Sequence, residues 1–415
     1  RNEKLTYAFE HRNAIYGRQY PKNFRPEHIC YRKDHPEELA IINYTSGTTG
    51  YSKGVMLPYR SLWSNVAYCF EMLPVKPGDH IVSMLPMGHV FGMVYDFLYG
   101  FSAGAHIYFL TRMPSPKIIS QSFSEIKPRV ISCVPLIVEK IIKKDILPKV
   151  DSTIGKLLLK VPIVNDKIKS LARQAAMEIF GGNFDEIIIG GAPFNAEVEA
   201  FLKKIGFPYT IAYGMTECGP IICSSRWETL KLASCGKATS RMEVRIDSPD
   251  PKTHAGEIVC RGMNMMLGYY KNPEATAQII DANGWLHTGD LGTLDEEGYV
   301  TVRGRSKNLL LTSSGQNIYP EEIESKLNNM PYVAESLIVL QHEKLVAMIY
   351  PDFDDAFAHG LQQTDIQKVM EQNRIELNQQ LPNYSQISKI KIHFEEFEKT
   401  AKKSIKRFMY QEAKG

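Results

Sequence analysis

The stretch Tyr44–Leu57, YTSGTTGYSKGVML, decides how this chain can fold, because a glycine-rich loop follows the apolar run Leu39–Ile42. It holds three glycines, several hydroxyl groups and one lysine, Lys53. Backbone N–H groups of such a turn can converge on an anion, while the hydroxyls and the lysine add donors and positive charge. The stretch therefore predicts a phosphate-binding loop after a buried strand. A hairpin tip that binds no ligand is the alternative.

The loop differs from that of a phosphoryl-transfer NTPase. The NTPase loop has glycine directly before its lysine and serine or threonine directly after it. Here Ser52 precedes Lys53 and Gly54 follows it, so neither position matches. The phosphate chemistry predicted for this loop is therefore of another kind.

The composition is that of a globular protein with two or three structural units, since the chain has 415 residues, 44% of them hydrophobic and 23% charged. A net charge of +3 and a pI near 8.3 are too mild to indicate nucleic acid, and we expect no such partner. Seven cysteines form no CxxC pair, which predicts reduced thiols and a cytoplasmic location. The apolar window Met93–Leu110 contains Asp96 and His106 and indicates buried core rather than a membrane span.

Strands and helices alternate over the first part of the chain, which predicts an α/β unit with a largely parallel sheet. The expected strands cover 38–46, 79–87, 104–110, 129–135, 185–191 and 209–214, and the expected helices include 58–73 and 89–103. Short strands and turns between Glu243 and Arg305 predict an antiparallel, barrel-like unit, and the rest predicts a small α+β domain. We therefore expect a large domain over residues 1–306 and a small C-terminal domain over residues 307–415.

Further motifs follow the glycine loop along the chain. They are GGAP (Gly190–Pro193), YGMTECGP (Tyr213–Pro220), the segment Gly256–Thr276, GWLHTGDLG (Gly284–Gly292) and the segment Gly304–Glu324. In order and approximate spacing, this series resembles the adenylate-forming superfamily of acyl-CoA synthetases, luciferases and peptide-synthetase adenylation domains. The resemblance covers nearly the whole chain. It implies a large domain that binds ATP and an acyl substrate, followed by a mobile small domain.

The resemblance also implies a reaction. A carboxylate attacks the α-phosphate of ATP and expels pyrophosphate, and a coenzyme A thiol then displaces AMP. Both reactants of the first step are anions, so the site needs cations, hydroxyl groups and Mg²⁺. Glu217 matches the family's magnesium ligand, and Thr216 matches its catalytic threonine at the α-phosphate. The implied ATP and AMP contacts are Thr45, Ser46, Gly47, Thr48, Thr49, Gly50, Lys53, Gly191, Ala192, Pro193, Tyr213, Gly214, Thr216, Asp290 and Arg305.

The resemblance assigns the nucleoside side of this set as follows. Tyr213 matches the aromatic residue on the adenine face, and Gly191 and Ala192 match the turn beside it. Asp290 matches the acid that accepts the ribose hydroxyls, and Arg305 matches the arginine that assists it. By residue type alone, Asp290 would be a turn residue of a hairpin and Arg305 a partner in a surface ion pair.

Other matches concern the acyl group and the second half-reaction. His89 lies where the family has an aromatic residue or a histidine near the acyl pocket and the thiol tunnel, so a catalytic gating or pocket-lining role is one interpretation. A packed core histidine is the other. Lys307 matches the hinge about which the small domain turns between adenylation and thioester formation. Gly315 and Gln316 lie in the segment that would line the pantetheine path.

The C-terminal region departs from the family. Relatives carry a lysine, within the pattern T-x-x-G-K-x-x-R, that bridges the carboxylate and the α-phosphate. Aligning Thr400 and Arg407 with this pattern places Ser404 at the lysine position. Lys403 is the first candidate to take the catalytic role instead. The alternative is that the lysine-rich run is a solvated basic tail.

The segment Leu136–Gly182 indicates which carboxylic acid the protein would activate. The preceding VP, the VEK within the segment and its basic, apolar helices resemble the long-chain fatty acyl-CoA synthetase branch. No aspartate clearly matches the one that holds the ammonium group in amino-acid-activating relatives, so we expect a long-chain fatty acid. The interleaved lysines suggest peripheral contact with a membrane surface, although an amphipathic helix packed on the large domain is the favoured interpretation.

The sequence thus predicts an AMP-forming long-chain fatty acid–CoA ligase that uses Mg²⁺, ATP and coenzyme A. A fatty acyl-AMP ligase that loads a carrier protein is the nearest rival. A non-catalytic homologue that binds nucleotide and fatty acid is the second rival, suggested by Ser404 and by a glycine loop only about forty residues from the start. Because relatives have a longer region before that loop, we expect the chain to be truncated relative to the family.

Overall fold

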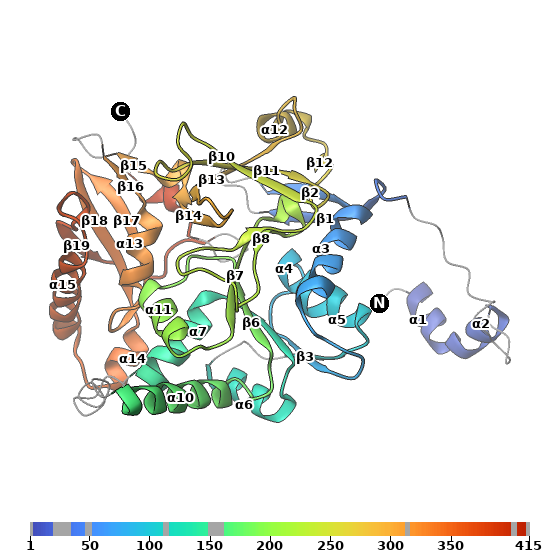
Figure 1. The fold of residues 1–415 in the computed structure, drawn as a ribbon, viewed down its shortest axis with the longest axis horizontal. Coiled ribbons are helices and arrows are strands. Elements are labelled where there is room, and N and C mark those ends of the chain that lie inside the picture. The colour runs from blue at the N-terminus through green and yellow to red at the C-terminus, as the bar shows by residue number, and fades with distance from the viewer. Residues whose placement is uncertain are drawn as a thin grey trace.

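The computed structural model describes residues 3–19, 35–45, 52–110, 116–147, 162–311, 316–399 and 405–411 (Figure 1). Two short helices, α1 (Glu3–Glu10) and α2 (Arg12–Gln19), pack against each other, and Figure 1 draws them apart from the other elements. The remaining elements form a large α/β part and a smaller C-terminal part, which confirms the predicted fold class.

A sheet of seven strands forms the centre of the large part. Its order is β4-β3-β5-β6-β7-β8-β9, and its neighbours are parallel from β4 to β7, as predicted. The last two pairs are antiparallel. The strands are β3 (His80–Ser83), β4 (His106–Phe109), β5 (Val130–Cys133), β6 (Glu186–Gly190), β7 (Tyr209–Gly214), β8 (Ile221–Ser224) and β9 (Lys237–Ala238).

Helices cover both faces of this sheet (Figure 1). Successive strand residues point to opposite faces. Ile187 and Ile189 of β6 therefore share one hydrophobic cluster with Phe123, whereas Ile188 packs on the other face with Tyr68. Strands that are apolar on both faces are typical of a buried parallel sheet. The flanking elements are α3 (Tyr59–Met72), α4 (Val90–Gly92), η2 (Met93–Tyr99), α5 (Gly100–Ser102), α6 (Pro116–Ile126), α7 (Pro135–Ile141), η3 (Ile142–Ile146), α10 (Pro162–Ile179) and α11 (Ala196–Lys204).

Two antiparallel sheets complete the large part. The first consists of β1 (Leu39–Thr45), β2 (Lys53–Pro58) and β12 (Gly268–Tyr269), which is followed by α12 (Pro273–Ile279). The glycine stretch is thus the connection of a β-hairpin, and a second strand that the sequence analysis did not predict precedes α3. The second sheet has the order β10-β11-β13-β14 and does not close into a barrel among the residues described. Its strands are β10 (Met242–Asp247), β11 (Gly256–Gly262), β13 (Leu286–Leu294) and β14 (Val300–Arg305).

The small C-terminal part has its own hydrophobic core, which includes Ile323, Ile338, Ala347 and Met370. Two of its strands pair antiparallel and the third joins them in parallel, in the order β17-β18-β19. The elements are η5 (Ser306–Asn308), β15 (Leu310–Leu311), β16 (Asn317–Ile318), α13 (Pro320–Leu327), β17 (Val333–Gln341), β18 (Lys344–Pro351), α14 (Phe353–Ala358), α15 (Gln363–Gln379), η6 (Asn383–Ser385), β19 (Lys389–Ile392) and η7 (Arg407–Met409).

Helix α10 carries much of the basic, apolar segment that the sequence analysis related to a membrane surface. Its residues Ala172 and Ala176 are buried in the core with Phe123 and Phe207, so one face packs on the large part. This agrees with the favoured interpretation of an amphipathic core helix. Among the described residues, no helix combines the length and the apolar character needed to cross a bilayer.

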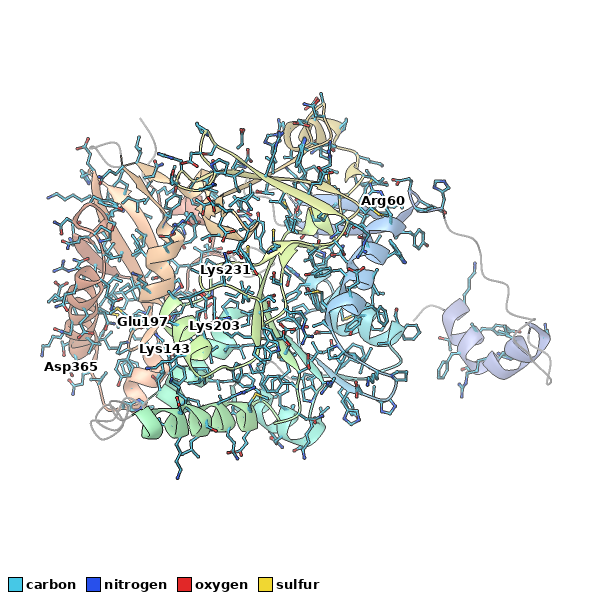
Figure 2. All side chains as sticks on the ribbon, in the orientation of Figure 1. Arg60, Lys143, Glu197, Lys203, Lys231 and Asp365 are labelled. Atoms are coloured by element: carbon cyan, nitrogen blue, oxygen red, sulfur yellow. The ribbon has the colours of Figure 1, made fainter. Side chains whose placement is uncertain are left out.

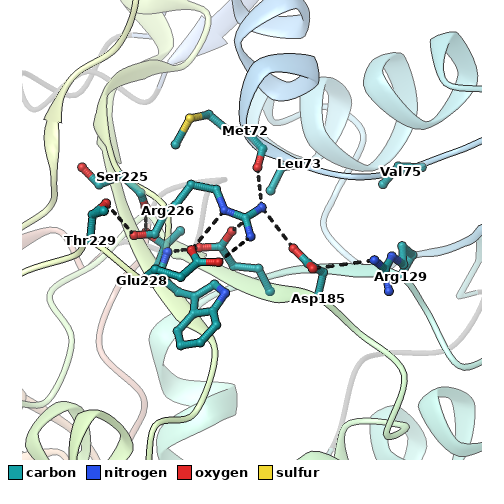
Figure 3. A network of polar contacts seen from close by, with 12 residues as sticks. Met72, Leu73, Val75, Arg129, Asp185, Ser225, Arg226, Glu228 and Thr229 are labelled. Carbon is teal, nitrogen blue, oxygen red and sulfur yellow. Dashed lines mark hydrogen bonds and ion pairs between the residues drawn. The ribbon is translucent and has the colours of Figure 1, made fainter.

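A polar network joins the amino-terminal edge of the central sheet to α3 (Figure 3). Arg226 donates to the carbonyl oxygen of Met72 over 2.6 Å and forms an ion pair with Asp185 at 3.1 Å. Glu186, only 1% exposed, accepts a hydrogen bond of 2.7 Å from the amide of Trp227. Burial raises the pKa of Glu186 from its usual 4.5 to about 8, although the nearby Arg226 opposes the shift.

This buried carboxyl predicts a pH dependence of stability. Because the folded state holds the Glu186 proton more tightly than the unfolded state, its contribution is complete below pH 4.5 and is lost as the pH rises towards 8. The slope for one group is at most about 1.4 kcal/mol per pH unit. Glu186→Gln keeps the oxygen that accepts from Trp227 and removes the titration. Urea unfolding at several pH values should show the variant gaining on the wild type from pH 5 to pH 8. A constant difference would contradict this assignment.

Candidate active site

The predicted motif segments meet at the carboxyl-terminal edge of the central sheet, where ligands bind in open α/β sheets. The GGAP turn leaves β6 at Gly190, and a Cβ on that glycine would lie 3.3 Å from the ring of Phe91. Asn43 of β1 donates through Nδ2 to the carbonyl oxygen of Gly88 over 2.9 Å. The hairpin that carries the glycine stretch and the loop that carries His89 are therefore neighbours.

The segment from Gly214 to Pro220 folds back tightly after β7 and places Glu217 in the short helix η4 (Thr216–Cys218). A Cβ on Gly214 would lie 2.0 Å from the carbonyl oxygen of Pro220. Gly219 has a φ of +57°, and a Cβ there would lie 2.3 Å from Oγ of Ser61. Only glycine fits either position without a shift of its neighbours. Thr216 and Glu217 are both buried.

Buried polar side chains of α3 hold this segment in place. Asn65 donates through Nδ2 to the carbonyl oxygen of Cys218 over 3.1 Å and accepts from the amide of Ile221 over 2.9 Å. Outside α3, Asn264 donates through Nδ2 to the carbonyl oxygen of Ile221, and the backbone carbonyl oxygen of Asn264 accepts from Oγ of Ser61 over 2.6 Å. The sequence analysis missed these residues. For Ser61 and Asn65, the signal available was a pair of polar residues four positions apart in the helix predicted over 58–73.

Glu217 is linked to the glycine hairpin through Tyr269. The hydroxyl of Tyr269, in β12, donates to Oε1 of Glu217 over 2.7 Å. The ammonium group of Lys53 lies 4.8 Å from the centre of the same tyrosine ring, within the range of a cation–π contact. Burial, and then the neighbouring Glu217, raise the pKa of Tyr269, so its phenol stays a hydrogen-bond donor. The sequence analysis did not single out Tyr269, although its motif was recognised.

The donor set around Glu217 fits Mg²⁺ bound together with a nucleotide. Within the described ranges, no group of three or more histidine, cysteine, aspartate or glutamate side chains could hold a metal ion by itself. Protein sites for Mg²⁺ commonly use one or two carboxylates and leave the other positions to substrate phosphates and water. Glu217, buried beside the base of the glycine hairpin, supplies one such carboxylate.

Asp290 forms the second polar centre of the site. It is 5% exposed, accepts from the hydroxyl of Tyr213 over 2.7 Å and forms an ion pair with Nε of Arg305 at 3.0 Å. Burial raises the pKa of Asp290, whereas Arg305 and Tyr213 oppose the shift. Asp290 lies within strand β13 rather than in a turn. Arg305, 49% exposed, does form an ion pair, but with a buried partner.

The strand before Asp290 is anchored by Glu257 of β11. Its carboxylate accepts from the amide of Gly289 over 2.9 Å and pairs with Nδ1 of His287 at 2.8 Å. This contact raises the pKa of His287. The hydroxyl of Thr288 accepts from the amide of Asp290 over 3.0 Å. The HTGD motif therefore positions its aspartate through backbone and side-chain contacts alike.

The remaining predicted residues lie in several places. The exposed turn after β6 contains Gly191, with a φ of +90°, and the neighbouring Ala192 and Pro193. His89 caps α4, with Nδ1 accepting from the amide of Phe91 over 3.2 Å, so its gating role stays a prediction. Lys307 lies exposed in η5. Thr45 and Lys53 pair at the base of the hairpin, and Gln316 is exposed before β16. Outside the described residues lie Ser46, Gly47, Thr48, Thr49, Gly50, Gly315, Lys403 and Ser404.

One buried carboxyl beside this region was not proposed as a site residue from the sequence. Asp96 lies in the π-helical element η2, a type of irregularity frequent at functional sites, and is 1% exposed. Burial raises the pKa of Asp96 to about 7, and the hydroxyls of Ser132 and Ser83 oppose the shift. Asp96 therefore lies next to the ends of β3 and β5 and not next to the turn after β6.

The sequence profile of the AMP-binding enzyme family matches residues 5–270, well over half of the chain. The chain belongs to this family. The profile of the AMP-binding enzyme C-terminal domain matches residues 307–413. The large and small parts of the fold thus correspond to the two kinds of domain that these profiles describe.

Curated relatives act on different acids. The chain is 33% identical over 307 residues to 3-[(3aS,4S,7aS)-7a-methyl-1,5-dioxo-octahydro-1H-inden-4-yl]propanoyl:CoA ligase of Rhodococcus jostii, covering 73% of this chain and 53% of the relative. It is 27% identical over 345 residues to a long-chain-fatty-acid–CoA ligase of Gallus gallus, covering 76% and 44%. It is 33% identical over 312 residues to 2-succinylbenzoate–CoA ligase of Bacillus cereus, covering 73% and 57%. The chain thus spans about half the length of these relatives.

Solved structures share the fold. The chain superposes on the ATP-bound RpMatB-BxBclM chimera B1 with a TM-score of 0.69 at 25% identity, covering 92% of this chain and 69% of the chimera. For apo MatB from Rhodopseudomonas palustris the TM-score is 0.58 at 25% identity, with the same coverage. O-succinylbenzoate coenzyme A synthetase from Bacillus subtilis, in complex with ATP and magnesium ion, gives 0.69 at 23% identity, covering 92% and 72%.

Proposed function

We propose that the protein is an AMP-forming acid–CoA ligase whose acid is a long-chain fatty acid. The observation that carries this proposal is the link between Glu217, Tyr269 and Lys53 at the base of the glycine hairpin. This arrangement places a hard oxygen ligand and a cation against the same tyrosine side chain, and a site for a nucleoside triphosphate with its Mg²⁺ needs both. Family membership and acid–CoA ligases among the relatives support the same reaction.

In the proposed first step, a carboxylate oxygen of the acid attacks the α-phosphorus of ATP, and the bond to pyrophosphate breaks. The product is an acyl-adenylate. Lys53 and the hydroxyl of Thr216 would stabilise the anionic phosphates, and Asp290 with Arg305 would hold the ribose. Bound Mg²⁺ would supply further positive charge at the phosphates beside Glu217. In the second step, the thiol of coenzyme A attacks the acyl carbon, AMP leaves, and the thiol proton is released.

The second step is proposed to follow a turn of the small domain, residues 307–415, about Lys307. Exposure of this residue in a short 3₁₀ element between the two parts suits a position that absorbs backbone rotation. Gly315 and Gln316 would then line the pantetheine path, and Lys403 would serve the first step from the opposite orientation.

The long-chain acid is the finer part of the proposal. It rests on the VP and VEK pattern around α7 and on the long-chain-fatty-acid–CoA ligase among the relatives. The relatives that are 33% identical act on a bicyclic propanoate and on 2-succinylbenzoate, so these acids are the natural competitors in a test. A cytoplasmic location is proposed with it, and the burial of six free cysteines among the described residues is consistent with a reducing compartment.

The test is pyrophosphate release by the purified chain across saturated fatty acids of increasing length and 2-succinylbenzoate, each with and without coenzyme A. The proposal predicts the highest turnover with a long-chain acid and steady release only when coenzyme A is present. A single turnover unaffected by coenzyme A would favour a fatty acyl-AMP ligase that loads a carrier protein. Preference for 2-succinylbenzoate would overturn the choice of acid but keep the ligase reaction.

A further inference from the structure

A polar joint connects the large part to the small part at the end of α13, whereas Asn308, next to the proposed hinge, contacts Glu321 in the first turn of this helix. The joint is made by α7 with its continuation η3, by the first residues of α11, and by the end of α13. Figure 2 labels Lys143 and Glu197 where these elements meet. Three partners of the joint, Glu139, Asn195 and Asn329, lie up to 190 positions apart in the sequence.

Glu139 is the centre of this joint. It is 4% exposed, and its two carboxylate oxygens accept from different elements. Oε1 accepts from the backbone amide of Asn195 over 2.7 Å, and Oε2 accepts from Nδ2 of Asn329 over 3.0 Å. The first bond ties the helix that follows the VP turn to the segment that follows GGAP. The second ties both to the small part.

Neighbouring side chains complete the joint. Lys143, one helical turn after Glu139, donates to the carbonyl oxygen of Asn329 over 3.2 Å, where a cation suits the end of a helix. Burial lowers the pKa of Lys143, and the nearby Glu197 and Glu139 oppose that shift. Asn195 caps α11 through Oδ1, accepting from the amides of Glu197 and Val198. Each charged group of the joint thus has an opposite charge or a hydrogen-bond donor beside it.

We propose that Glu139 and Asn329 form a latch that holds the small domain in the orientation for adenylate formation, which makes Glu139 a positioning residue. The proposal rests on the proposed ligase function. Glu139 belongs to the helix after VP and accepts from the segment after GGAP, whose turn the resemblance places beside adenine. Docking of Asn329 therefore depends on the relative position of these two segments. Release of the latch would free the small domain for thioester formation.

A comparison with solved structures favours the adenylate-forming orientation. The fold superposes better on an ATP-bound chimera than on apo MatB, with TM-scores of 0.69 and 0.58. In the same arrangement, Glu324 and Glu321 on α13 face different partners. Glu324 pairs with Arg407 at 2.6 Å inside the small part, and Glu321 is close enough to affect the ionisation of Asp290. Helix α13 therefore runs from the proposed ribose site to the latch.

The test exchanges the donor and the acceptor of the hydrogen bond between Asn329 and Glu139. Asn329→Asp places a carboxylate against Glu139. Adding Glu139→Gln restores the bond with the glutamine NH2 group as donor, while the single side-chain oxygen of the glutamine still accepts from the amide of Asn195. We expect Asn329→Asp to slow acyl-adenylate formation about tenfold to a hundredfold, the worth of a hydrogen bond to a charged group. Thioester formation from supplied acyl-adenylate should change less than about twofold. The double variant should recover most of the first rate.

Asn328→Ala is the matched control, because Asn328 is the adjacent asparagine and its side-chain oxygen has no hydrogen-bond partner in the described part of the chain. It should leave both half-reactions unchanged. Amide hydrogen exchange over 320–329 reports the latch without relying on activity, and it should rise in Asn329→Asp and fall back in the double variant. If the wild type forms no adenylate, the proposed function fails while the exchange data still decide on the latch. Equal loss in both half-reactions, or no rescue, would overturn the proposal.

Discussion

Glu217→Gln is expected to lower the rate of acyl-adenylate formation by about 100-fold to 1000-fold, the range seen when one electrostatic contributor is removed from a preorganised site. Glutamine keeps the size of the side chain and an oxygen that can accept from Tyr269, but it removes the negative charge that suits Mg²⁺. The measurement is single-turnover formation of acyl-adenylate at saturating ATP. Raising the Mg²⁺ concentration should recover part of the loss, because the metal affinity is what the variant weakens.

Tyr269→Phe provides the graded comparison for this prediction. It leaves the ring under Lys53 and removes only the hydroxyl that donates to Glu217. A hydrogen bond to a charged group is worth about 1.5–3 kcal/mol, so a loss of about tenfold to a hundredfold is expected, below that of Glu217→Gln. If Glu217→Gln keeps the wild-type rate and the wild-type dependence on Mg²⁺, Glu217 is not the metal ligand.

Asp290→Asn is expected to weaken ATP binding by about tenfold to a hundredfold with a smaller effect on the maximal rate. The carboxylate lies buried between Tyr213 and Arg305, so the charge removed is one that the site holds in place for a partner. Loss of charged hydrogen bonds to the two ribose hydroxyls gives this magnitude. Binding of a non-hydrolysable ATP analogue, measured by calorimetry, reports the affinity directly.

The same calorimetry on Asp247→Asn gives the matched control. Asp247 lies exposed on β10 of the same four-stranded sheet, and the chemical change is identical. It should bind the analogue like the wild type. A thermal unfolding scan of Asp290→Asn separates lost binding from lost folding. If Asp290→Asn folds and binds the analogue with wild-type affinity, the ribose assignment is wrong.

Local patterns were enough to predict the five parallel strands of the central sheet, but not its two antiparallel strands, β8 and β9. The apolar runs that became β5 and β6 are buried on both faces, and such runs carry a strong signal along the chain. The second strand of the hairpin, β2, was missed because its residues follow a glycine-rich loop and then lead directly into α3. The segment Lys53–Pro58 becomes a strand by pairing with β1 and β12, which is a tertiary effect.

In the candidate site, too, residues in local motifs could be predicted, whereas residues that act through tertiary contacts could not. Glu217, Asp290 and Arg305 could be proposed because each lies in a recognisable motif. Tyr269 meets Glu217 across 52 positions, and Asn65 meets Cys218 across 153 positions. Such contacts depend on how the sheets pack and leave no periodic trace in the sequence. A buried polar residue in an apolar segment is the one local sign they share, since burial requires a partner.

The central claim is that a carboxylate attacks the α-phosphate of ATP in this protein. Incubation of the purified chain with ATP, Mg²⁺, coenzyme A and a long-chain fatty acid labelled with ¹⁸O in its carboxylate tests it most directly. Attack at the α-phosphorus transfers one carboxylate oxygen to the nucleotide, so mass spectrometry should find one ¹⁸O in each AMP formed. Unlabelled AMP, or ADP in place of AMP, would contradict the account.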